Sequence, residues 1–112
     1  MHELSIAQSI VDLAENVAEN EKADTIQTID IEIGALSGVM LDALEFAMEI
    51  TVKNTKLENA SINYLKKEGK ALCSECNFLF KTDSLLTLCP KCKRASFKIV
   101  DGKQLRIKSL TV

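Results

Sequence analysis

Four cysteines constrain this chain more than any other feature. They form two C-x2-C pairs, Cys73 with Cys76 and Cys89 with Cys92, and twelve residues separate the pairs. Two thiolates that lie two residues apart can turn around one ion, and two such turns that face each other complete a tetrahedral S4 site. The spacing therefore predicts a structural zinc site. A redox-active dithiol pair is the alternative interpretation.

The twelve residues between the pairs fit a short hairpin, with Phe78 and Phe80 on one arm and Leu86 and Leu88 on the other. We therefore predict a zinc ribbon at this place in the chain. Four sulfur ligands close the coordination shell of a zinc ion, so zinc catalysis is not expected.

The rest of the chain shows helical and strand periodicities. Residues 4–20 and 41–52 carry apolar side chains on one helical face. Residues 25–34 and 60–64 alternate between apolar and polar side chains, which is typical of strands with one buried face. Residues 66–70 are read as an exposed connector.

The C-terminal part predicts two further strands, Phe97–Val100 and Leu105–Val112. They flank an Asp101-Gly102 pair, which is a hairpin turn signal because both residues tolerate positive φ.

These elements predict an α+β fold, a small mixed β-sheet covered by two helices, with an inserted zinc-ribbon module. The expected domains are an α/β domain of residues 1–68 plus 97–112 and a zinc-ribbon domain of residues 69–96.

Composition and charge narrow the class of protein. The chain has 112 residues and no apolar run of the roughly 20 residues that a membrane span needs. Acidic residues replace the basic start of a signal peptide, so we expect a cytoplasmic protein. Residues 1–60 carry a net charge of −9 and residues 61–112 a net charge of +7. Two solvated faces that attract each other within the fold explain this asymmetry most simply.

The basic half also allows a rival function, a zinc ribbon that binds nucleic acid through lysine and arginine contacts to phosphate. The sequence pI of about 5.4 and the few aromatic residues argue against it. A second rival is an adaptor whose ribbon only mediates protein contacts. An enzyme is not expected, because the single histidine is residue 2 and no glycine-rich phosphate loop is present.

The N-terminus offers a different metal chemistry. The amine of Met1, the amide and imidazole of His2 and the side chain or amide of Glu3 can form adjoining chelate rings. Nitrogen-rich sites of this kind suit Ni²⁺ and Cu²⁺. Residue chemistry alone favours the plainer alternative, a frayed terminus with an exposed histidine.

Four stretches carry a resemblance to a known family. They are the opening Met1-His2-Glu3-Leu4-Ser5-Ile6-Ala7-Gln8-Ser9-Ile10, the turn Ile33-Gly34-Ala35-Leu36-Ser37-Gly38-Val39, the helical Leu44-Glu45-Phe46-Ala47, and the cysteine ribbon with Cys89-Pro90-Lys91-Cys92. Together they resemble the HypA/HybF family of nickel-delivery proteins in [NiFe]-hydrogenase maturation. The resemblance spans essentially the whole chain in order.

The resemblance implies that His2 is the essential nickel ligand, with the Met1 amine and Glu3 nearby. It implies a structural Zn(II) held by the four cysteines, with Ni(II) as the transferred cargo. It also implies transfer with the HypB GTPase to the [NiFe]-hydrogenase large-subunit precursor. A weak homodimer stays an open alternative to a monomer.

Two departures from the family pattern are visible. A Gly-Ser pair often follows the last cysteine in the family, where this chain has Lys93-Arg94. The family often has a glutamate at the position of Gln104, so any role proposed for that carboxylate is in doubt here.

Overall fold

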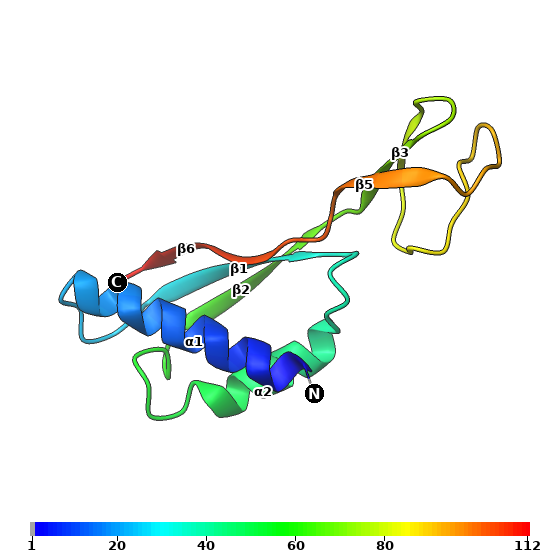
Figure 1. Cartoon of the computed structure of the whole chain (residues 1–112). Coiled ribbons are helices and arrows are strands. Elements are labelled where there is room, and N and C mark those ends of the chain that lie inside the picture. Colours follow the sequence, from blue (N-terminus) through cyan, green and yellow to red (C-terminus); the bar gives the residue numbers. More distant parts are fainter. Residues whose placement is uncertain (1) are drawn as a thin grey trace. The chain divides into compact units, whose positions relative to one another are not determined.

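The computed structural model describes residues 2–112, with the side chains of residues 3–112. It contains two helices and six strands within that range. Figure 1 shows how they follow one another along the chain. In chain order they are α1 (His2–Asn20), β1 (Thr28–Gly34), α2 (Leu41–Thr51), β2 (Ser61–Lys67), β3 (Lys70–Cys73), β4 (Leu79–Lys81), β5 (Phe97–Asp101) and β6 (Leu105–Thr111). The predicted α+β class with two helices is confirmed. No helix in the described range is long and apolar enough to cross a membrane.

The chain divides into two compact units. The helix–sheet unit comprises Met1–Ile31, Val39–Leu65 and Arg106–Val112, and the cysteine unit comprises Glu32–Gly38 and Lys66–Leu105. This division places residues 97–105 with the cysteines, because β5 pairs with β3. The assignment of a nickel-binding domain and a zinc-ribbon domain stays a prediction.

The helix–sheet unit is built around strands in the order β2-β1-β6. The Ser61 N–H donates to the Gln27 carbonyl and the Asn63 side chain donates to Asp30, so β1 and β2 run parallel. The Gln27 N–H donates to the Thr111 carbonyl and the Ser109 hydroxyl donates to Asp30, so β1 and β6 run antiparallel. The sheet is therefore mixed, as predicted.

Both helices lie on one side of these strands in Figure 1 and contact each other. The alternation of β1 buries Ile29 and Ile31 completely. The core between helices and strands is aliphatic, and its helical members are Ala7, Ile10, Val11, Ala14, Ala18, Leu44, Ala47 and Met48. This burial supplies the main stabilisation of the unit.

The cysteine unit holds a second sheet in the order β4-β3-β5. Both neighbours of β3 are antiparallel to it, with Ala71 opposite Phe80 on one side and Ile99 on the other. The predicted connector at residues 66–70 is instead the end of β2, a turn and the start of β3.

The predicted hairpin between the cysteine pairs is wrong. Residues 82–96 contain no strand, and β4 folds back onto β3 rather than forward onto Leu86 and Leu88. The reason is local. The first cysteine pair reverses the chain directly after β3, so β3 is the nearest partner for β4. Leu86 is 94% exposed as a result.

The predicted hairpin at Asp101-Gly102 is also wrong, although the turn itself is present. Gly102 has a φ of +102°, as the turn signal requires. However, β5 pairs with β3 and β6 pairs with β1, so the turn carries the chain from one sheet to the other. A Cβ on Gly34 would meet the Gly102 carbonyl, so this crossing needs glycine at position 34.

Candidate metal centre

The first cysteine pair sits in a tight backbone loop at the end of β3. The Asn77 N–H donates to the Cys73 carbonyl over 3.0 Å, and the Cys73 N–H donates to the Phe78 carbonyl over 3.0 Å. Asn77 has a φ of +59°, which an asparagine tolerates better than most residues. The loop turns both thiols of the pair toward one point.

The second cysteine pair repeats this loop bond for bond. The Lys93 N–H donates to the Cys89 carbonyl over 2.8 Å, and the Cys89 N–H donates to the Arg94 carbonyl over 2.9 Å. Lys93 has a φ of +64°. Here a lysine occupies the left-handed conformation in which glycine is preferred, at one of the two departures from the family pattern.

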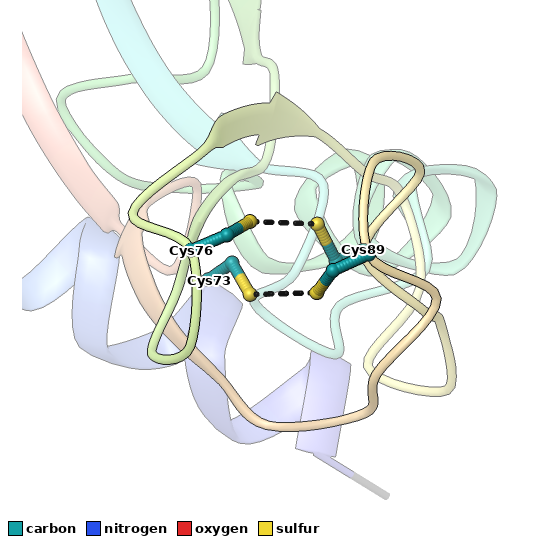
Figure 2. Close-up of side chains that lie close together, drawn as sticks. Cys73, Cys76 and Cys89 are labelled. Atoms are coloured by element: carbon teal, nitrogen blue, oxygen red, sulfur yellow. Dashed lines mark hydrogen bonds between the residues drawn. The ribbon is translucent and has the colours of Figure 1, made fainter.

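The two loops bring all four sulfur atoms together, as Figure 2 shows for the labelled cysteines. The four Sγ atoms lie within 4.8 Å of one another. Two of the distances, Cys73 to Cys92 and Cys76 to Cys89, are 3.5 Å and 3.6 Å. A disulfide requires about 2.05 Å, so these are free thiols. Both of these contacts run from one cysteine pair to the other.

Hydrogen bonding and burial together leave two of the four thiols with a lowered pKa and the other two with a raised pKa. Hydrogen bonds from the backbone N–H groups of Cys76 and Glu75 lower the pKa of Cys73 to about 6, against the opposing effect of burial. Burial raises the pKa of Cys89, but hydrogen bonds from the backbone of Cys92 and Lys91 outweigh it and the pKa falls. One thiol of each pair is therefore inclined to ionise, which a metal ligand must do.

The other two thiols have raised pKa values. Burial is the largest cause for Cys76 and brings its pKa to about 12. For Cys92, a backbone hydrogen bond from Arg94 lowers the pKa, but burial and the thiols of Cys73 and Cys89 raise it further. Four thiols in contact cannot all hold a negative charge without a cation between them.

The donor set fits a zinc ion. A tetrahedron with zinc–sulfur bonds of about 2.3 Å has sulfur–sulfur edges of about 3.8 Å. The observed distances of 3.5 Å and 3.6 Å are close to that edge. All four predicted cysteines converge, and they form the one cluster of metal-ligating side chains among the residues whose side chains are described.

The predicted nickel ligands lie at the start of α1. His2 is the first residue of the helix, but its side chain and all of Met1 lie outside the described residues. Glu3 is described and half-buried. Its Oε2 accepts a hydrogen bond of 3.3 Å from the Met40 N–H, and Met40 is the N-cap of α2. The cysteine cluster and the start of α1 belong to different units.

Sequence reasoning missed the Glu3–Met40 hydrogen bond and the paired loop residues Asn77 and Lys93. A contact across 37 residues has no local signal. The loop residues do have one, because each directly follows the second cysteine of a C-x2-C pair. The equal positions predict equal backbone conformations.

The family model described as "Hydrogenase/urease nickel incorporation, metallochaperone, hypA" matches residues 1–112. The chain belongs to the HypA family. The Hydrogenase maturation factor HypA of Parabacteroides distasonis is 45% identical over 112 residues, which cover all of this chain and 97% of that protein. The protein of the same name from Prosthecochloris aestuarii is 37% identical over the full chain and 99% of its own length.

Solved structures agree with this HypA fold. The solution structure of the Ni metallochaperone HypA from Helicobacter pylori matches with a TM-score of 0.68 over 97% of this chain and 95% of that one, at 23% identity. A second solution structure of a HypA protein matches with a TM-score of 0.71 at 26% identity, over 99% of this chain and 95% of that one. The family model and the relatives confirm the predicted family and its link to hydrogenase maturation. The four convergent cysteines support the predicted metal-binding character.

Proposed function

We propose that this HypA protein is a nickel metallochaperone that binds Ni(II) at its N-terminus, with His2 as the anchoring ligand. The Met1 amine and Glu3 complete the donor set on this proposal. The main supporting observation is that α1 begins at His2. The first N–H groups of a helix have no acceptor within the helix, so the His2 amide is not committed to a helical hydrogen bond.

Glu3 supports the same site in a second way. Its hydrogen bond to the Met40 N–H ties the first turn of α1 to the start of α2. The terminus is therefore held against the unit at Glu3, one residue after His2. A cation held by a few donors at a terminus can leave through ligand exchange, which suits delivery.

The four cysteines would hold a structural Zn(II), which supplies a crosslink between the two loops and no open coordination position. The residues of the chain do the rest. Backbone hydrogen bonds fix both loops, and the buried ring of Phe80 packs edge-on against Phe97 beside them, with ring centroids 6.0 Å apart. Free thiols at this site accord with a cytoplasmic protein.

The cargo would pass, with the HypB GTPase, to the [NiFe]-hydrogenase large-subunit precursor. The protein acts in this pathway by binding and release, without catalysing a reaction. Nickel transfer from the loaded chain to a large-subunit precursor, measured with and without HypB, tests the partners. Equal transfer without HypB would remove that GTPase from the proposal.

The metal assignment is tested with untagged protein that keeps its native N-terminus, because a tag would convert the proposed amine ligand into an amide. Zinc content and nickel titration are compared for the parent and for His2→Ala. We expect one zinc in both proteins and nickel binding in the parent alone. Equal nickel binding would overturn the N-terminal site and leave the adaptor function as the better explanation.

A further inference from the structure

An open groove lies between α2 and β2 in the helix–sheet unit. Its volume is about 390 Å³, and Met48, Leu57 and Ile62 are among its apolar lining residues. Met48 and Leu57 are fully buried, so this part of the lining is continuous with the core. Close packing beneath it makes the groove a fixed feature of the surface.

Carboxylates stand along one side of this α2–β2 groove. Glu45 and Glu49 are exposed and lie one turn apart on α2, and Glu58 follows the helix. Glu58 accepts a hydrogen bond of 2.6 Å from the Asn54 N–H. Within residues 3–112, no hydrogen bond or ion pair engages the carboxylates of Glu45 and Glu49. These two can therefore pair with a cation from outside.

The other side of the groove is the free edge of a sheet. β2 has one neighbour, β1, and is therefore an edge strand. The Ser61 N–H donates toward β1, so strand alternation directs the N–H groups of Ile62 and Tyr64 toward the open edge. Over residues 61–65, the part of β2 in this unit, the edge carries neither charge nor proline, the usual protections of an edge, and Lys66 and Lys67 follow at the end of the strand.

Apolar side chains continue this surface on α2. Phe46 is 65% exposed and Ile50 is 50% exposed, and the two lie one helical turn apart beside Glu45 and Glu49. An exposed aromatic and an exposed isoleucine in neighbouring positions are typical of a protein contact surface.

We propose that the α2–β2 groove is the docking site for an extended, lysine- or arginine-bearing segment of another protein, which adds as a strand to the edge of β2. The aliphatic stems of its basic side chains lie along the apolar lining, and their charged ends reach Glu45 and Glu49. Charge complementarity selects this occupant, because residues 1–60 carry a net charge of −9 and repel an acidic segment. The proposal is independent of nickel binding.

Tyr64 makes the groove directly observable. It lines the groove, and it is the one tyrosine in a chain without tryptophan. Burial, together with the negative charges of Glu45 and Glu49, raises the pKa of Tyr64 to about 12. A segment docked in the groove would cover this ring, so occupancy should change the Tyr64 fluorescence at neutral pH.

The test uses the full zinc-loaded chain and a short capped peptide in which lysine alternates with threonine. We expect a saturable change in Tyr64 fluorescence at neutral pH in the presence of the peptide. Glu45→Gln with Glu49→Gln should weaken binding about tenfold or more. The matched control, Asp12→Asn with Glu19→Gln on α1, removes the same charge and should leave the affinity within about twofold.

Three results would overturn the proposal. One is an equal loss of affinity in the α1 control, which would mean general electrostatic attraction. Another is equal binding of a glutamate–threonine peptide. The third is a Tyr64 signal that depends on protein concentration without peptide, which would assign the groove to a second copy of this chain. The comparison of the lysine and glutamate peptides on the parent needs no variant, so it decides even if the double substitution perturbs folding.

Discussion

The two units of this protein are held together by different means. The helix–sheet unit buries a continuous aliphatic core under two helices. The buried cluster around the cysteines has four members, Ala71, Cys73, Phe80 and Cys89, and two of these are candidate metal ligands. The helix–sheet unit has enough apolar side chains to fold by burying them. In the cysteine unit, sulfur ligands stand where most of such a core would be.

The sizes of the burial and entropy terms explain why the cysteine unit should need its metal. Complete burial of one phenylalanine stabilises by about 1.5–3 kcal/mol. Each ordered residue costs about 1–2 kcal/mol in backbone entropy. A cluster this small cannot offset that cost, so the cysteine unit should depend on its metal while the helix–sheet unit should not. The following changes are ways to break that contrast.

Metal removal should have the largest effect. Cys89→Ser should abolish stoichiometric zinc and unfold the cysteine unit, because structural zinc supplies binding free energy on the order of 10 kcal/mol. NMR spectra should then lose dispersed signals from residues 66–105 and keep those of α1 and α2. Ser74→Ala, an exposed change within the first loop, is the control. Loss of both helices in Cys89→Ser would contradict the contrast.

Gly34→Ala should be the next most damaging change. The Cβ of an alanine here would fall on the Gly102 carbonyl, whose atoms belong to the backbone and cannot move aside alone. We expect a cost of about 3 kcal/mol or more in urea unfolding. Gly38→Ala is the matched control. Gly38 has a φ of +81° and no atom near its added Cβ, so it should cost only about 1 kcal/mol. Similar losses of unfolding free energy at both positions would contradict the close approach of Gly34 to the Gly102 carbonyl.

A cavity in the aliphatic core should destabilise the first unit alone. Leu44 is fully buried on α2, and Leu44→Ala should cost about 2–5 kcal/mol. Zinc content should remain unchanged, since no cysteine lies in that unit. Leu86→Ala removes the same atoms from a leucine that is 94% exposed, and should cost less than about 0.5 kcal/mol. Zinc loss in Leu44→Ala would show that the two units do not fold separately.

The smallest expected effect is a pH dependence at Asp101. Hydrogen bonds from the Gln104 side chain and the Gly102 N–H lower its pKa below 3.8, despite partial desolvation. A carboxyl with a lowered pKa stabilises the fold above its unfolded value, and this contribution is lost as the pH falls through the folded value. The parent should therefore lose its stability advantage over Asp101→Asn on acidification below about pH 4. A constant difference across that range would contradict the assignment.

The sequence predicted what is local or strictly periodic. The 3.6-residue spacing of apolar side chains predicted α1 and α2 to within a few residues, and the alternation of Ile29, Ile31 and Ile33 predicted β1. It missed β3, whose four residues bury only Ala71 and Cys73 and follow a run that reads as a polar connector. Four residues are too few to establish a period.

Strand pairing could not be predicted from these patterns. Asp101-Gly102 correctly signals a turn, but the partners of the flanking strands are β3 and β1, which lie far back in the chain. The cysteine cluster was predicted because ligand spacing is itself local. The N-terminal nickel site stays a prediction, because Met1 and the His2 side chain lie outside the described residues.

The order of the strands has a consequence for synthesis. β6 pairs with β1, yet it is the last strand in the chain and follows all four cysteines. Only twelve residues separate Cys92 from β6, so the exit tunnel of the ribosome still holds the second cysteine pair when β6 is made. The complete set of thiols therefore emerges almost together with the strand that finishes the first sheet, and vectorial synthesis gives neither unit a long start in folding.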